Sequence, residues 1–214
     1  MVDRKTYDLL KNKYGKVSSW AIWADAEEDK PASNVDKLDM FEDIDSIIKE
    51  LKTDYVFVGL NAASHGEERS IDDWRAFHST CNHKQRDYKL RQALKGSVYW
   101  GAYITDVIKI KENGKLKGIP ETKSKKVMEK YNNDPDVRRD AAIILKEELR
   151  DIGGTPTLIA FGNNAYRILS EMQKQYTFLK SIRIIKATHY SYVCKEYKKK
   201  LNDILEKEKL PGLK

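Results

Sequence analysis

The sequence is poor in the residues that build cross-linked or membrane proteins. Its 214 residues include two cysteines, Cys81 and Cys194, too few for a disulfide framework or a four-thiolate iron–sulfur cluster within one chain. No apolar run is long enough to cross a bilayer, and the opening residues MVDRKTYDLL lack the apolar region of a signal peptide. We therefore expect a cytoplasmic monomer that does not contact a membrane.

Several motifs of nucleotide and ester chemistry are also missing. The chain has neither a Gly-x-Ser-x-Gly elbow nor a Gly-rich phosphate loop, which argues against a serine hydrolase and a P-loop enzyme. It contains no internal repeat and no low-complexity segment. Its length fits one domain, which we assign to residues 1–214, with a helical N-terminal extension at 1–50 and a core at 55–205.

The charge that is present is uneven along the chain. The formal net charge is +7, and residues 174–214 hold eleven Lys or Arg against four Asp or Glu, so this segment alone accounts for it. A basic end on a neutral body favours a polyanionic partner such as DNA. The alternative is a helix whose many lysines simply face solvent.

Four apolar segments alternate with amphipathic ones, which predicts parallel strands covered by helices on both faces. The expected fold is a three-layer α/β/α sandwich around a four-stranded parallel sheet. Trp20 and Trp23 are expected in its core. The predicted strands are 55–60, 98–110, 157–161 and 182–187, and the predicted helices are 3–15, 40–51, 86–94, 123–131, 135–151, 163–175 and 192–210.

Polar residues follow each predicted strand. They are Asn61 and His65 after the first strand, Thr105 and Asp106 at the second, Gly162, Asn163 and Asn164 after the third, and His189 and Ser191 after the fourth. In open parallel sheets ligands bind beyond the carboxyl ends of the strands. These residues are therefore the first candidates for a functional site.

At these strand ends the sequence resembles the uracil-DNA glycosylase superfamily. The segment VGLNAA resembles the first motif of the family, and VYWGAYITDVIK resembles its second strand. The segment TLIAFGNNAYRIL resembles the strand–Gly–helix unit that precedes the last motif. The segment ATHYSY stands where the family has its His-Pro-Ser motif. The resemblance spans residues 55 to about 205 and implies a uracil-DNA glycosylase-like fold. The implied activity is excision of a damaged or deaminated base from DNA by hydrolysis of its N-glycosidic bond, after the base is flipped into a pocket.

The resemblance also implies roles for individual residues. Asn61 would orient the attacking water, and His189 would donate a hydrogen bond to the leaving base. Asp106 would be the third catalytic residue. The implied base-binding residues are Gly59, Leu60, Phe77 and Tyr103, where an aromatic ring would stack on the flipped base. The implied DNA-binding residues are Ser191, Asn163, Lys195, Lys198 and Lys199.

Three positions depart from the family pattern. Ala62 and Tyr190 replace prolines, which removes a local backbone restraint at each site. Asp106 stands where the family often has Asn, and an ionised carboxylate can only accept hydrogen bonds. The substrate is then not uracil, or Asp106 is protonated, or Asp106 activates water. These departures keep two alternatives open: a catalytically inactive relative that binds nucleic acid or a protein, and an α/β hydrolase of small nucleotides.

The segment FHSTCNHK brings together three zinc-ligand types, His78, Cys81 and His83, with His65 as a candidate fourth ligand. The spacing does not match a common finger pattern. The alternative is a loop that lines the mouth of the pocket. We expect neither a metal nor a cofactor.

Overall fold

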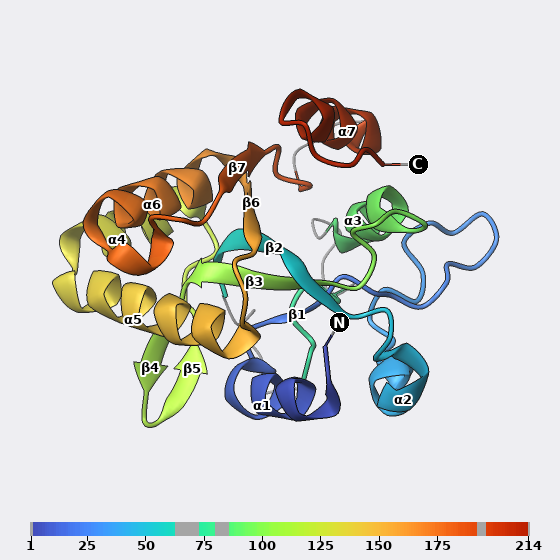
Figure 1. Ribbon diagram of the computed structural model, residues 1–214, viewed down its shortest axis with the longest axis horizontal. Coiled ribbons are helices and arrows are strands. Elements are labelled where there is room, and N and C mark those ends of the chain that lie inside the picture. The colour runs from blue at the N-terminus through green and yellow to red at the C-terminus, as the bar shows by residue number, and fades with distance from the viewer. Residues whose placement is uncertain (1, 63–72, 80–85, 192–195, 214) are drawn as a thin grey trace.

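The computed structural model describes residues 2–62, 73–79, 86–191 and 196–213 (Figure 1). Its centre is a five-stranded sheet with the order β1-β3-β2-β6-β7. The four longer strands run parallel, and β1 pairs antiparallel with β3 at one edge. The strands are β1 (Ser19–Trp20), β2 (Lys52–Asn61), β3 (Ala102–Ile108), β6 (Thr157–Phe161) and β7 (Ile184–Ala187).

The predicted α/β class with a mostly parallel sheet is confirmed, but the expected number of four strands is wrong. The extra strand, β1, has two residues, which is too short for an alternating pattern to reveal. Ser19 pairs with Ile104 and Trp20 with Tyr103. Residues before position 50 therefore contribute a strand to the central sheet.

Helices cover both faces of the sheet, so the molecule has three layers (Figure 1). One face packs against α1 (Arg4–Tyr14), α4 (Ser124–Asn133), α5 (Pro135–Ile152) and α6 (Gly162–Gln175). The other packs against α3 (Asp87–Leu94) and α7 (Tyr197–Lys207). Each face has its own cluster of buried apolar side chains, as expected for a parallel sheet.

The longest helix shows how local sequence sets the boundaries. Asp134 caps α5 by accepting hydrogen bonds from the backbone N–H groups of Asp136 and Val137, and Pro135 occupies the first turn, where it loses no helical hydrogen bond. Gly153 ends the helix with φ 77°, a conformation that favours glycine. The prediction of a helix over 135–151 is confirmed.

The prediction of a helix over 40–51 is wrong. Residues 40–51 do not form one helix, because the chain leaves helical geometry at Asp43 and divides the segment into η1 (Asp39–Phe41) and α2 (Ile44–Ile47). The segment ENGKLKG belongs to a hairpin of β4 (Ile110–Glu112) and β5 (Lys115–Lys117). Asn113 and Gly114 both have positive φ at its turn, the conformation that an Asn-Gly pair favours. A second 3-10 helix, η2, spans Thr177–Leu179.

A buried ion pair joins β3 to α5. Lys109 and Glu148 are both inaccessible to solvent, and Lys109 Nζ lies 2.5 Å from Glu148 Oε2. Glu148 Oε1 also accepts hydrogen bonds from the hydroxyls of Ser18 at 2.7 Å and of Tyr103 and Thr105 at 3.0 Å. The desolvated carboxylate is thus surrounded by donors, which is the condition for tolerating a buried charge.

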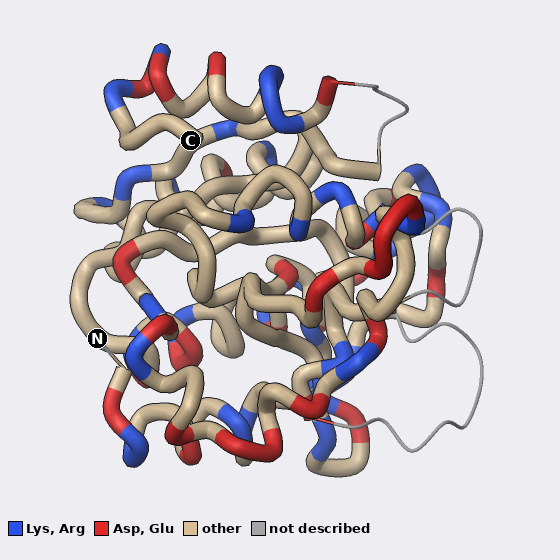
Figure 2. The backbone as a smooth tube through the Cα atoms, turned by 90° about the vertical axis from the view of Figure 1, so that its right-hand side faces the viewer, with Lys and Arg blue, Asp and Glu red and all other residues tan. Residues whose placement is uncertain are grey.

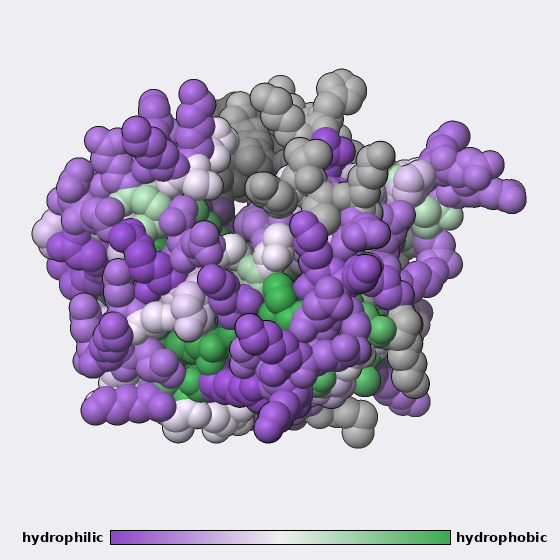
Figure 3. Space-filling view, turned by 90° about the horizontal axis from the view of Figure 1, so that it is seen from above, coloured by the Kyte–Doolittle hydropathy of each residue, from purple (hydrophilic) through white to green (hydrophobic). Residues whose placement is uncertain are grey.

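Charges of both signs are distributed over the surface (Figure 2). In α7 (Tyr197–Lys207) three consecutive lysines, Lys198 to Lys200, occupy the first turn, and Asp203 and Glu206 follow in the later turns. The view from above is mostly hydrophilic, with small hydrophobic areas between polar residues (Figure 3). Among the described residues, no helix is long and apolar enough to cross a bilayer.

Candidate functional site

The strand order reverses direction between β2 and β6. Along the chain, β3 is added on one side of β2, whereas β6 and β7 are added on the other. Ligands in open α/β sheets bind at this point of reversal, outside the carboxyl ends of the strands. The residues to consider are therefore those at Gly59–Asn61, at Asp106, at Gly162 and after β7.

Gly59 and Asp106 form the centre of this region. They are opposite each other in the β2–β3 register. A Cβ atom at Gly59 would lie 2.2 Å from Asp106 Oδ1, so the carboxyl group occupies the space that any other residue at position 59 would need. Asp106 is 7% exposed, and burial raises its pKa to about 7, although Lys109 and the backbone N–H of Asn61 oppose the shift.

Phe77 lies beside this pair. Its ring atom Cζ is 3.4 Å from the same Cβ position of Gly59. The Phe77 backbone has φ 63°, which is unusual for a bulky residue, and the indole N–H of Trp23 donates to its carbonyl oxygen at 3.0 Å. A half-buried aromatic ring is thus held next to Gly59 by a strained backbone conformation, a feature concentrated at functional sites.

A second buried carboxyl group, Asp87, lies at the start of α3. It accepts a hydrogen bond from the backbone N–H of Ser79 at 3.0 Å and another from the hydroxyl of Tyr190. Burial raises the pKa of Asp87 to about 6. Burial raises the pKa of Tyr190 well above its usual range, and the charges of Asp87 and Asp106 add to the shift. The hydrogen bond of Tyr190 connects the start of α3 with the segment after β7.

His189 stacks on Tyr190 with ring centroids 4.7 Å apart and contacts the edge of Phe161. Its Nδ1 accepts hydrogen bonds from the backbone N–H of Ser191 at 3.1 Å and from the Ser191 hydroxyl at 2.8 Å. The neutral ring must then carry its proton on Nε2. Burial lowers the pKa of His189 to about 4, so the ring is neutral at physiological pH and can donate from Nε2.

Asn61 has a different environment from the one expected. Its side-chain N–H groups donate to the carbonyl oxygens of Ile119 at 2.9 Å and Glu121 at 3.1 Å, and its Oδ1 accepts from the N–H of Ile119 at 2.9 Å. The amide thus anchors the segment that follows β5. Its backbone N–H, rather than its side chain, faces Asp106.

Two of the expected base-binding residues lie on the opposite face of the sheet. Tyr103 is fully buried, packs against Trp20 and donates to Glu148. Leu60 packs against the same apolar cluster. Side chains alternate along a strand, so Tyr103 and Leu60 point away from the face that carries Asp106. Gly59 and Phe77 remain next to Asp106.

The expected DNA-binding residues that the structure describes are exposed. Asn163 lies in the first turn of α6, Ser191 adjoins His189, and Lys198 and Lys199 lie in the first turn of α7. The N-terminus of α6 has no side-chain cap, which leaves its first N–H groups oriented toward the sheet edge. Lys195 lies outside the described residues.

A polar cavity of about 700 Å³ lies between α4 and α6. It is lined by two cations (Lys125, Arg167), one acid (Glu129), three amides (Asn132, Asn133, Asn164) and Met128. Arg167 donates to the side-chain oxygen of Asn132 at 3.2 Å. The cations thus exceed the acids of this lining by one.

His78 is buried away from solvent. Its Nε2 lies 2.7 Å from the carbonyl oxygen of Ile22, and its Nδ1 lies 2.9 Å from that of Ala76. Each nitrogen thus lies next to a backbone carbonyl oxygen, and the neutral ring, whose pKa is lowered by burial, donates to one of the two. Cys81, His83 and His65 lie outside the described residues. Within the described part of the chain, no group of three His, Cys, Asp or Glu side chains is arranged to hold a metal.

Sequence reasoning missed Asp87 as a member of the site. It precedes an amphipathic helix and resembles an ordinary acidic residue of a first helical turn. Only the tertiary fold shows that it is buried beside Tyr190.

No family model matches the sequence, and no curated protein matches it significantly. Its function therefore has to be inferred from the arrangement of these side chains.

Proposed function

We propose that the protein is a DNA glycosylase that removes a damaged or deaminated base by hydrolysing its N-glycosidic bond. The observation that supports this most strongly is the buried carboxyl group of Asp106 against the backbone of Gly59, with the ring of Phe77 beside it. Tyr190 carries a neutral histidine, His189, on its ring and donates a hydrogen bond to the second buried carboxyl group, Asp87. A carboxyl group, an aromatic surface and a hydrogen-bond donor are what this reaction requires.

Asp106 is the residue that acts on water. The transition state resembles an oxocarbenium ion, and a nearby carboxylate both attracts a proton from water and stabilises the positive charge. A pKa of about 7 leaves Asp106 partly ionised at neutral pH. Asn61 cannot share this task while its amide holds Ile119 and Glu121.

His189 stabilises the leaving base. The base departs with negative charge, and a neutral imidazole with its proton on Nε2 donates a hydrogen bond to that charge. Ser191 fixes this tautomer through its two hydrogen bonds to Nδ1. Stacking on Tyr190 holds the plane of the ring.

Phe77 stacks on the extruded base. It is half-buried and already packed against Gly59, so little side-chain freedom is lost when a base covers it. Stacking on an aromatic ring contributes about 1–3 kcal/mol per base. The protonation state of Asp106 then tunes the choice of base, because only the neutral acid can donate as well as accept.

DNA binds across the carboxyl edge of the sheet. The uncapped first turn of α6 and the exposed Lys198 and Lys199 supply donors and positive charge for backbone phosphates. The cations of the cavity between α4 and α6 extend this surface. Binding that depends on such contacts weakens steeply with salt.

The proposal is tested with labelled duplex oligonucleotides that contain uracil, hypoxanthine, xanthine or mismatched thymine. We expect release of at least one base, and a rate reduction of about 100-fold or more in Asp106→Ala, the usual effect of losing a general base. Asp54→Ala, which removes an exposed acid in the amino half of β2, is the matched control and should act like the unmodified protein. Salt-sensitive DNA binding without excision of any base would instead support a non-catalytic role.

A further inference from the structure

Two segments far apart in the sequence carry the side chains assigned to the extruded base. Phe77 belongs to residues 73–79, the Phe77 segment, and His189 belongs to residues 188–191, the His189 segment. Both side chains are partly exposed, and neither segment forms a helix or a strand. No backbone ladder therefore fixes the spacing of the two rings, which depends on side chains that join the segments.

The buried carboxyl group of Asp87 contacts both segments. Its Oδ2 accepts a hydrogen bond from the backbone N–H of Ser79 at 3.0 Å, two residues after Phe77. It also accepts one from the hydroxyl of Tyr190, the residue next to His189. Asp87 is 6% exposed and Tyr190 is 8% exposed, so both lie beneath the two partly exposed rings. One carboxyl group thus ties the Phe77 segment to the His189 segment.

Helix α3 gives this carboxyl group a firm base. Asp87 lies in its first turn, and the apolar residues of the helix are buried against the sheet. Arg91, one turn later, donates to the carbonyl oxygens of Ala24 at 2.6 Å and Pro31 at 2.7 Å. A side chain on an anchored helix holds its partners more precisely than one on a loop.

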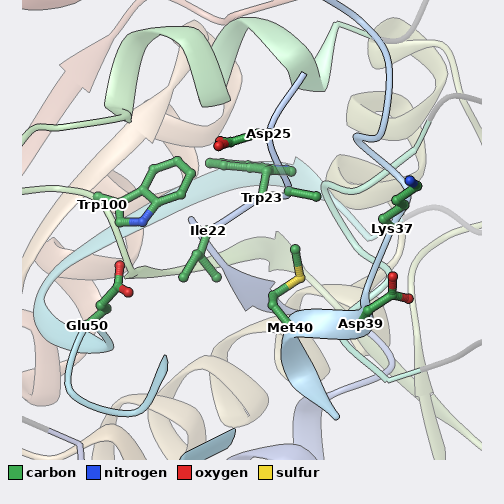
Figure 4. Close-up of a pocket in the computed structure, with 9 residues that line it drawn as sticks. Ile22, Trp23, Asp25, Lys37, Asp39, Met40, Glu50 and Trp100 are labelled. Carbon is green, nitrogen blue, oxygen red and sulfur yellow. The ribbon is translucent and has the colours of Figure 1, made fainter. Parts of the chain in front are cut away.

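The Phe77 segment is also fixed from the N-terminal part of the chain. The indole N–H of Trp23 donates to the carbonyl oxygen of Phe77 at 3.0 Å. The buried ring of Trp23 stacks on His78 and packs against Trp100 at the wall of a cavity of about 350 Å³ (Figure 4). A φ of 63° at a bulky residue persists only where the surroundings impose it. The hydrogen bonds at Phe77 and Ser79 supply that restraint.

We propose that Asp87 is a positioning residue that sets the spacing between the stacking ring of Phe77 and the donor His189. This inference rests on the proposed base excision, in which both rings contact the same base. Asp87 is buried below them and acts only through Ser79 and Tyr190. A displacement of about 1 Å in such a pocket costs on the order of 100-fold in rate, so the spacing matters for catalysis.

The role requires a carboxylate rather than an amide. Two donors, the N–H of Ser79 and the hydroxyl of Tyr190, converge on Asp87. An ionised carboxylate accepts at both oxygens and has no donor, whereas Asn has one accepting oxygen and an N–H group. In Asp87→Asn one of the two donors would therefore face another donor. The losses in this variant should lie between those of the unmodified protein and those of Asp87→Ala.

The first test follows the imidazole of His189 by NMR and needs no substrate. The signal, assigned by its loss in His189→Gln, should show the proton on Nε2 and titrate with a pKa of about 4. Tyr190→Phe removes the hydroxyl that donates to Asp87 but keeps the ring on which His189 stacks. We expect the pKa of His189 to rise toward its ordinary value of about 6.5 in this variant and in Asp87→Ala, because the loosened ring admits water.

Single-turnover excision separates the two connections. Tyr190→Phe should lower the maximal rate about tenfold and leave the half-saturating enzyme concentration unchanged, because the Phe77 segment keeps its hydrogen bond to Asp87. Asp87→Ala releases both segments, so the maximal rate should fall about 100-fold and the half-saturating concentration should rise about fivefold. Adding Tyr190→Phe to Asp87→Ala should cause no further loss, because the hydroxyl has no partner left to lose.

The matched controls are Asp136→Ala, an exposed acid in the first turn of α5, and Tyr176→Phe, an exposed ring. Both should leave the NMR titration and the excision kinetics unchanged. Every variant is measured well below its melting temperature, with circular dichroism to establish that it is folded. Tyr190→Phe decides the proposal even if Asp87→Ala fails to fold.

The outcomes distinguish this proposal from base excision itself. An unchanged pKa of His189 in Tyr190→Phe would overturn the role of Asp87, whatever the excision rates are. An unchanged half-saturating concentration in folded Asp87→Ala would overturn its connection to Phe77. If the unmodified protein excises no base while the pKa of His189 rises in Tyr190→Phe, the proposed function is wrong and Asp87 still positions the His189 ring.

Discussion

Replacing Lys109 by Met leaves a buried carboxylate without its cation. Lys109 and Glu148 are both inaccessible to solvent and 2.5 Å apart. Met fills a similar apolar volume, so the substitution chiefly removes the charge and the hydrogen bonds of Nζ to Glu148 and Thr105. The free energy of unfolding should therefore report the cost of the unpaired charge.

The expected loss follows from the surroundings of Glu148. Removing one partner of a buried pair typically costs about 3–5 kcal/mol. The three hydroxyl donors of Ser18, Tyr103 and Thr105 remain, so we expect about 3 kcal/mol, the lower end of that range. For a chain of this size that corresponds to a fall of about 6–12 °C in Tm.

The measurement is urea unfolding followed by circular dichroism, with Lys111→Met as the control. Lys111 is exposed on β4, two residues away, and its replacement should change stability by less than about 0.5 kcal/mol. The double variant Lys109→Met/Glu148→Leu should recover at least part of the loss, because no charge then remains buried. A loss below about 1 kcal/mol in Lys109→Met would refute this reasoning.

Three further outcomes are expected. Gly59→Ala should lower the free energy of unfolding by about 1–3 kcal/mol in thermal unfolding, because the added Cβ meets the carboxyl oxygen of Asp106 at 2.2 Å. Most of that loss should disappear when Asp106 is also replaced by Ala. Equal losses with and without Asp106 would contradict the close approach. The pKa of Asp106 is raised to about 7, so between about pH 4 and 7 the folded state retains a proton that the unfolded state releases. The free energy of unfolding should therefore fall over this range by an amount on the order of 4 kcal/mol, and this fall should be absent in Asp106→Asn. The pKa of His189 is lowered to about 4, which adds a rise in the free energy of unfolding between about pH 4 and 6.5 that His189→Gln should remove. Asn61→Ala should lower the free energy of unfolding by about 1–3 kcal/mol in urea, because the hydrogen bonds of its amide to Ile119 are lost. Most of the excision activity should remain. A loss of activity as large as that of Asp106→Ala would mean that the amide takes part in the reaction.

The sequence predicted the parallel sheet well because its strands are continuous apolar runs. β6 matches the predicted boundaries, and β7 begins two residues later than predicted. The long helices were also predictable, since α5 carries its own cap, proline and terminal glycine. The edge strand β1 was not, because a two-residue strand is defined by its partner rather than by its own pattern.

The candidate site was predictable in position more than in detail. Parallel topology alone places the residues at the ends of β2, β3, β6 and β7 along one edge, and so indicated Asp106 and His189. It could not show that Tyr103 faces α5 or that the amide of Asn61 holds Ile119. It also could not show that Asp87 is buried, because burial depends on tertiary contacts that a single sequence does not contain.

The most direct test of the account is the pH dependence of base excision under single-turnover conditions. If ionised Asp106 acts on water, the rate should rise with pH and level off above about pH 7, near the pKa of this carboxyl group. In Asp106→Asn the rate should fall about 100-fold or more, and the inflection should vanish. An unchanged rate and an unchanged inflection in Asp106→Asn would contradict the central claim.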